Sequence, residues 1–197
     1  MALALAFQDF ENFLNRKKLT EIENLSEDVI DGSLLKKDDL IKKLLEYIKN
    51  QIVSVKARNN LKNLLSIFTL MIKNSNEVSK IQDLFNQNNA VNIILSILSN
   101  YRYLDDDLMI AILEFLNVLL LKRNQNVQRT IKQFFFSYRK SEVLFEKMNN
   151  IFERWISVLK GEDSKKMHSE TKHKLKKQCN LLLNFIQLST EGHYLDL

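Results

Sequence analysis

Proline is absent from this sequence of 197 residues, which also holds only three glycines and one cysteine. Glycine and proline supply the backbone conformations of hairpin turns and bulges, so their scarcity argues against a β-rich fold. An AT-rich coding sequence, which also enriches Asn, Lys, Ile and Phe, is a second explanation for the missing proline. The lone cysteine excludes a disulfide within the chain and favours a reducing, cytosolic setting.

Long hydrophobic runs are also missing. The most apolar stretch, Met109 to Leu121, contains Glu114 and Asn117 and is shorter than the roughly 20 residues that span a bilayer. The first residues, MALALAF, lack the basic start of a signal peptide and turn polar at Gln8. We therefore expect a cytosolic chain without a transmembrane segment.

The positive charge is concentrated in one part of the chain. The net charge is +5, and the stretch from Lys122 to Lys177 holds 15 Lys and Arg against 6 Asp and Glu. Basic residues also follow the aromatic run Phe134, Phe135 and Phe136, which suggests base stacking on a nucleic acid. At helical spacing such rings belong more often to a core, so we predict a core position and no nucleic-acid binding.

Apolar residues recur every three or four positions along most of the chain, which predicts an all-α fold. Asp105, Asp106 and Asp107 precede the most apolar helix, where acidic residues favour a helix start. Ser79 and Gln82 have the spacing of a helix cap. A long helix is expected from Ser141 to about residue 160, with core positions that include Leu144, Met148, Ile151, Trp155 and Val158. Cys179 is expected to be a small buried hydrophobe.

Residues with catalytic or metal-binding chemistry form no familiar pattern. The three adjacent aspartates do not converge from separated positions as ligands of a divalent cation do. His168 and His173 are five residues apart and do not share a helix face. Glycine-rich phosphate loops and nucleophile elbows are absent from the sequence. We therefore predict no catalytic residues, no metal, no cofactor and no enzymatic activity.

Helices in pairs joined by polar turns, with a repeat of about 40 residues, predict an armadillo/HEAT-like helical solenoid. Internal identity between the repeats is weak, so a plain helical bundle remains the alternative. The segment 161–177 is basic and poor in apolar residues, which predicts a linker before a final helix.

From residue 81 onward the sequence resembles the inositol trisphosphate receptor and ryanodine receptor family, and most closely the inositol trisphosphate receptors. In the family's homology domain a small residue (G, A or S) precedes N and two hydrophobic residues. A long apolar helix ending in LL-E-G-G-N follows, then V-Q or I-Q, a phenylalanine pair and S-E-x-F-F. The corresponding words here are Ala90 to Ile94, Leu119 to Asn124, Val127 with Gln128, Phe134 with Phe135, and Ser141 to Phe145. The family's associated domain opens with L-R-F-L-Q-L and E-N-H-x-x-D-L-Q, which resemble Leu183 to Leu188 and Glu191 to Leu197.

The resemblance implies four segments: weakly matching solenoid helices at 1–80, a receptor homology-type helical domain at 81–160, a basic linker at 161–177, and the truncated start of the associated domain at 178–197. It implies a non-catalytic regulatory segment of an intracellular calcium-release channel that relays conformational change to the pore, at the endoplasmic reticulum membrane. Partners would be other segments or subunits of a channel that is a homotetramer in the family. A free-standing armadillo-like scaffold with a protein partner on one face is the alternative. The turn and core residues implied are Asn124, Gln128, Phe134, Phe135, Phe145 and Trp155.

Two departures from the family pattern carry expectations of their own. Lys122 and Arg123 stand where the family has two glycines, so we expect this turn to avoid positive φ. The sequence stops inside the last motif, which is expected of a receptor fragment, a truncated gene model or a degenerate paralogue.

Overall fold

The computed structural model describes residue 38, residues 41–46 and 48, and residues 55–100, 104–137, 141–161 and 167–191. Within these ranges the chain is helical with short turns and contains no strand, so the predicted all-α class is confirmed. The predicted helices before residue 38 and the final motif after Glu191 lie outside the described residues.

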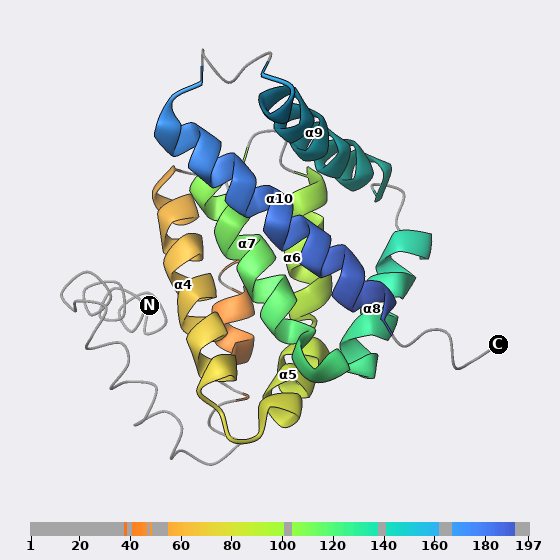
Figure 1. Cartoon of the computed structure of the whole chain (residues 1–197). Coiled ribbons are helices and arrows are strands. Elements are labelled where there is room, and N and C mark those ends of the chain that lie inside the picture. Colours follow the sequence, from red (N-terminus) through yellow and green to blue (C-terminus); the bar gives the residue numbers. More distant parts are fainter. Residues whose placement is uncertain are drawn as a thin grey trace.

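Seven α-helices are described in full. They are α4 (Val55–Lys73), α5 (Val78–Gln87), α6 (Ala90–Asn100), α7 (Asp106–Leu119), α8 (Gln125–Ser137), α9 (Ser141–Leu159) and α10 (Ser169–Thr190), with the short 3-10 helix η1 (Leu121–Arg123) between α7 and α8 (Figure 1). The predicted long helix from Ser141 is confirmed. The predicted linker at 161–177 is wrong in its second part, because α10 already begins at Ser169 and buries Leu175.

Helix α7 lies at the centre of the fold. Helix α4 packs along one side of it and α10 along the other, as Figure 1 shows. Ten of its 14 residues are buried, so this helix has almost no solvent-facing side. Its start is capped by Asp105, whose carboxylate accepts a hydrogen bond of 2.8 Å from the Leu108 amide, which confirms the helix-start role of the acidic run.

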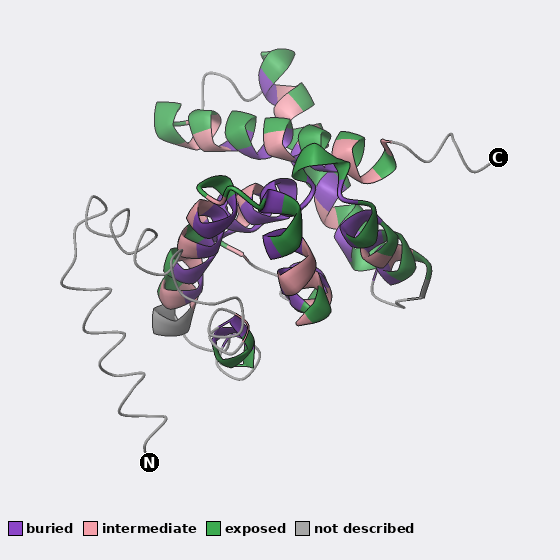
Figure 2. Ribbon diagram, turned by 90° about the horizontal axis from the view of Figure 1, so that it is seen from below, coloured by how far each residue is buried: buried purple, intermediate pink, exposed green. Residues whose placement is uncertain are grey.

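α-Helices that are three places apart in the chain order pack against each other. Besides the α4–α7 and α7–α10 pairs, α8 packs against α5 and α9 packs against α6. The buried residues face the spaces between these helices, and the exposed ones lie on the outer surfaces (Figure 2). Each described helix after α6 therefore contacts the helix three places earlier in the chain.

Three aromatic rings join α4, α5 and α7. Phe68 of α4, Phe85 of α5 and Phe115 of α7 are fully buried, and their ring centroids lie 4.9 to 5.8 Å apart. Tilted and edge-to-face rings at such distances stabilise a core beyond the area that they bury, by about 0.5 to 1.5 kcal/mol per pair. Cys179 of α10 is also buried in the core, as expected.

The turn after α7 depends on a buried glutamine. Gln82 of α5 is fully buried and its amide nitrogen donates two hydrogen bonds of 2.9 Å, to the carbonyl oxygens of Val118 and Leu121. The Val118 carbonyl lies in the last turn of α7 and the Leu121 carbonyl in η1, so Gln82 holds both sides of the point where α7 ends. The predicted capping role of Ser79 and Gln82 is wrong, since α5 begins at Val78 and its N-cap residue, Glu77, makes no side-chain cap.

The backbone at the same turn is left-handed at two residues that are not glycine. Lys122 and Arg123 both have φ of 58°, so the expectation that this turn would avoid positive φ is wrong. The hydrogen bond from Gln82 fixes the chain before this turn, and the cap of α8 fixes it after the turn. Lys122 and Arg123 therefore adopt the strained left-handed backbone conformation that joins the two. An L-residue in this conformation costs about 1 to 2 kcal/mol.

Replacing Lys122 with glycine removes that strain, since glycine adopts positive φ freely. We expect Lys122→Gly to raise the free energy of unfolding by about 1 kcal/mol in urea titration. The matched control is Gln133→Gly, at an exposed position within α8, which should lower it by about 1 kcal/mol. Equal destabilisation by both variants would contradict the left-handed turn.

Candidate functional site

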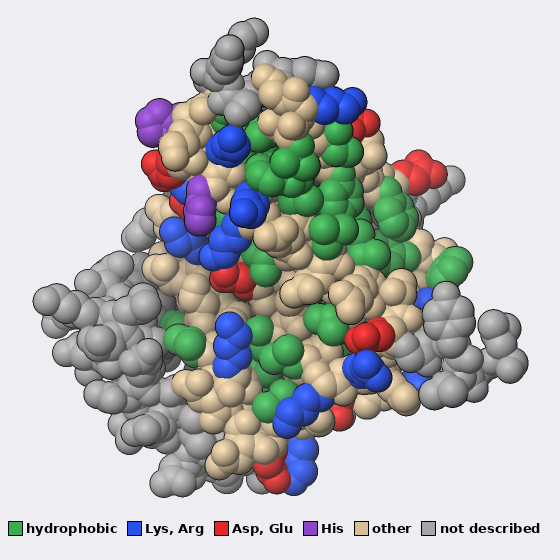
Figure 3. Space-filling view, viewed as in Figure 1, with side chains coloured by type: hydrophobic (Ala, Val, Ile, Leu, Met, Phe, Trp, Pro, Cys, Tyr) green, Lys and Arg blue, Asp and Glu red, His purple; other side chains and the backbone are tan. Residues whose placement is uncertain are grey.

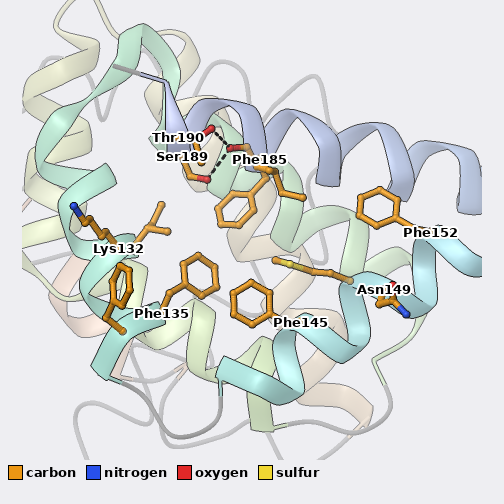
Figure 4. Close-up of a pocket in the computed structure, with 12 residues that line it drawn as sticks. Lys132, Phe135, Phe145, Asn149, Phe152, Phe185, Ser189 and Thr190 are labelled. Carbon is orange, nitrogen blue, oxygen red and sulfur yellow. Dashed lines mark hydrogen bonds between the residues drawn. The ribbon is translucent and has the colours of Figure 1, made fainter. Parts of the chain in front are cut away.

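A groove of about 720 Å³ lies in the described surface between α8, α9 and α10 (Figure 4). Its walls are mainly apolar and rich in aromatic side chains. They include Phe135 and Phe136 from α8, Phe145 and Phe152 from α9, and Phe185 and Ile186 from α10.

Helix α9 forms its wall of the groove because it carries two apolar stripes. The first faces the core and contains Leu144, Met148, Ile151 and Val158, which are buried. The second lies beside it and consists of Phe145, Phe152, Ile156 and Leu159, with the polar Asn149 between the two phenylalanines, at alternating spacings of four and three residues. Such spacing places side chains in one row along a helix and is typical of a seam that packs against another helix.

Much of this second stripe is open to solvent. Phe145 is 52% exposed, Ile156 47% and Leu159 68%, while Phe136 across the groove reaches 82%. Scattered apolar residues are common on protein surfaces, but a continuous row rimmed by polar groups is typical of a binding surface. In Figure 3 the hydrophobic side chains gather along this face, over the junction of α10 with α9 and α8.

The aromatic rings in the groove are held in place by one another. Phe135 and Phe145 stack with centroids 5.1 Å apart and planes 26° apart, and Phe134 meets Phe135 edge-on at 6.2 Å. The close-up shows Phe135, Phe145 and Phe185 directed into the same space from three different helices (Figure 4). The groove is therefore preformed by ring contacts within the chain.

The residues expected in the core divide into two groups. Phe134 is buried, and Phe135 and Trp155 are partly buried against the core. Phe145 is half exposed and Phe136 almost fully exposed, so the expectation of a core position is wrong for both. Helical spacing places a residue on a face of its helix, but whether another helix covers that face depends on the tertiary arrangement.

Asn124 and Gln128 are buried and join α8 to its neighbours. The Asn124 side chain caps α8 by accepting a bond of 3.0 Å from the Val127 amide, and donates to Gln82 and Asp83 of α5 at 3.2 and 3.1 Å. Gln128 donates to the carbonyl oxygens of Leu188 and Glu191 at the end of α10, both at 2.7 Å. These bonds hold the end of α10 against α8 and so set the width of the groove.

The polar groups in the groove are few and of modest reactivity. Ser189 and Thr190 donate their hydroxyls to the Ile186 carbonyl of their own helix, each at 2.9 Å. Lys132 and Asn149 lie on opposite sides, from α8 and α9 (Figure 4). This lining suits recognition of an apolar surface with a polar margin.

The perturbed ionisable groups lie outside the groove and have structural causes. A hydrogen bond from Lys174 lowers the pKa of Asp107, and the same bond raises the pKa of Lys174. Burial lowers the pKa of Lys147, whose ammonium donates to the Leu98 carbonyl, and burial raises the pKa of the Cys179 thiol. A raised pKa keeps that thiol protonated and weakly nucleophilic.

No three His, Cys, Asp or Glu residues gather closely enough to hold a metal ion within the described ranges. None of the helices described is long and apolar enough to cross a bilayer.

Comparison of the chain with known proteins identifies no relative. No protein-family model matches the chain, and neither the curated proteins nor the solved structures contain a match. The function must therefore be argued from the groove itself and from the resemblance of the sequence motifs.

The exposed apolar residues Ile156, Leu159 and Leu183, which lie on α9 and α10 but do not line the groove, were not predicted from the sequence. The signal for α9 was present, because its outer stripe has the same periodicity as its core stripe. A helix with two adjacent stripes needs two sets of neighbours, and the described chain covers the second stripe only in part, through the stack of Phe135 on Phe145.

A pair of neighbouring substitutions on α9 tests this arrangement. We expect Phe145→Asp to lower the free energy of unfolding by about 1 kcal/mol, chiefly through loss of the stacked ring. The control is Leu144→Asp, one residue earlier and 2% exposed, which should cost more than about 4 kcal/mol because it buries a charge. Thermal or urea denaturation measures both, and losses of equal size would show that Phe145 is a core residue after all.

Proposed function

We propose that this chain is a non-catalytic, armadillo/HEAT-like scaffold that binds another protein chain through the groove of α8, α9 and α10. The observation that carries the proposal is the outer stripe of α9, a mainly apolar row at the spacing of a helix seam in which Phe145, Ile156 and Leu159 remain 52%, 47% and 68% exposed. Exposure of such a row is unfavourable in water, and a partner helix laid along it would bury it.

The solenoid part of this proposal is supported by the recurring neighbours. Helices α4, α7 and α10 lie side by side, and the pairs α5–α8 and α6–α9 repeat the same relation. Contacts between each helix and the one three places later are typical of armadillo repeats, which contain three helices each. A plain bundle does not predict this recurrence.

The groove occupies the position where a further layer would be added. By the same rule, the next helices in the order would pack on α8 and α9 and beside α10. Solenoids are normally closed at such a position by a repeat with a polar outer face. Contact of the apolar side chains of α8, α9 and α10 with the helices of a partner would be more favourable than their exposure to water.

Site-specific crosslinking tests the proposal. A photoreactive benzoyl-phenylalanine placed at Phe136, in the cells that naturally make the protein, should form covalent adducts with a protein chain upon illumination. The same group placed at Asn63, exposed on α4 and across α7 from the groove, is the control and should form few adducts. Protein adducts that are missing at Phe136, or equally abundant at Asn63, would overturn the proposal.

A second proposal follows from the resemblance to inositol trisphosphate receptors, in which the chain is a cytosolic regulatory segment of a calcium-release channel at the endoplasmic reticulum. Its support is that Asn124 and Gln128, both within the resembling motifs, connect α8 to α5 and to α10. Helices linked in this way move together, which suits the relay of a rigid-body movement toward a pore.

Affinity purification of the tagged full chain tests this second proposal. If the chain is a segment or partner of such a channel, channel subunits from reticulum membranes should copurify with it. Recovery of the chain in a soluble complex that lacks channel subunits would contradict the channel role and leave the scaffold proposal standing.

A further inference from the structure

The proposed function leaves open which chain covers the groove, and the charges along its two edges bear on that question. The outer edge of α9, next to the apolar stripe, carries Glu142, Glu146 and Glu153 and ends at Lys160, all exposed, so that its net charge is negative. Within the described residues none of these carboxylates takes part in an ion pair, although Glu153 accepts a hydrogen bond of 2.6 Å from Asn149. This edge is therefore negative and directed toward solvent.

The opposite edge is positive. Lys132 lines the groove from α8, across from Asn149 (Figure 4), and Lys176 of α10 lies two helical turns before the exposed Leu183 on the same face. Neither lysine belongs to an ion pair among the residues that the structure describes. The face thus has an apolar centre, an acidic edge on α9 and a basic edge on α8 and α10.

A surface with this arrangement is complementary to itself. We propose that two copies of the chain pair through it, about a two-fold axis that runs along the groove and parallel to α9. This operation places the acidic edge of each copy over the basic edge of the other and apposes the two apolar centres. Pairing of one surface with itself is the defining property of a two-fold dimer. The inference rests on the proposed function, because it names the partner of the same groove.

A perpendicular two-fold axis, a membrane surface and a helix of another protein each match the charges of this face less well than the proposed pairing. A two-fold axis perpendicular to α9 would set the two acidic edges against each other, so the charges select the parallel axis. An anionic membrane would meet the lysines favourably but would be repelled by the three glutamates on the other edge. A helix from another protein needs no charge of both signs around the groove.

The size of the face sets the expected affinity. From Phe145 to Leu159 the α9 stripe covers 14 helical steps, about 21 Å. Three helices at a spacing of about 10 Å make the face about 20 Å wide, or about 400 Å² in projection. Counted over both copies this is about 800 Å², less than the roughly 1,200 Å² of specific interfaces. We therefore expect a weak, reversible dimer with a Kd of about 10 µM or higher.

Sedimentation equilibrium of the purified full chain, from about 1 to 100 µM, tests the pairing. The unmodified chain should shift from monomer to dimer over this range. Phe145→Asp should raise the Kd at least tenfold, whereas the control Asn63→Asp, at an exposed position of α4 across α7 from the groove, should leave it unchanged. A chain that stays monomeric throughout, or a dimer indifferent to Phe145→Asp, overturns the inference.

A charge exchange tests the orientation of the two copies. The variant with Glu146→Lys and Glu153→Lys has two basic edges, and the variant with Lys132→Glu and Lys176→Glu has two acidic edges. Each should be monomeric alone, and the two mixed should form a heterodimer, because unlike edges then meet at both contacts. Failure of the mixture to pair, when the unmodified chain dimerises, would overturn the proposed axis.

The same material separates this inference from the proposed function. If the purified chain is monomeric but Phe136 still crosslinks to a different protein, the groove binds a partner and self-pairing is wrong. Cosedimentation with vesicles containing one-third phosphatidylserine, in place of dimer formation, would overturn both proposals. Concentration-dependent crosslinking of Phe136 to a second copy of the chain would support both.

Discussion

The turn between α7 and α8 is the constraint on which the rest of the structure depends. Helix α7 is covered on both sides, so the carbonyl groups at its end cannot all reach water, and Gln82 supplies the missing donors from α5. The chain must then reverse within a few residues, which requires left-handed backbone at Lys122 and Arg123. Asn124 caps α8 at the end of this turn and ties it again to Gln82. The direction of α8, and with it one wall of the groove, follows from these few buried polar contacts.

The same contacts explain why the helices stack at a fixed interval. A buried amide that must find its partner on one particular helix allows few alternative arrangements, whereas apolar side chains tolerate many. Asn117 donates to the Leu181 carbonyl, Gln178 to Asp106, and Gln128 to the end of α10. Apolar burial supplies most of the stabilising free energy. The buried side-chain amides determine which pairs of helices pack together, because leaving an amide unpaired in the core is costly in free energy.

Sequence reasoning succeeded where the signal was local. The Asp105 cap, the helix from Ser141 and the buried Cys179 depend on neighbours within a few residues or on a strong apolar period. It failed where the outcome depended on distant parts of the chain. The partners of Gln82 lie 36 and 39 residues away, so a capping role with Ser79 was the only local interpretation. The exposure of Phe136 and Phe145 depends on the absence of a covering helix among the described residues, which no periodicity within α8 or α9 reveals.

The seam between α7 and α10 has a mechanical consequence. Contacts occur along its length, from Lys174 with Asp107, through Lys177 with Glu114, to Asn117 with the Leu181 carbonyl. Since the residue numbers rise together, the two helices run in the same direction. A force that slides α10 along α7 must break all of these contacts at once, whereas a force that lifts one end breaks them in succession. The seam should therefore withstand shear and yield to peeling, so the direction of a load would decide whether α10 stays docked.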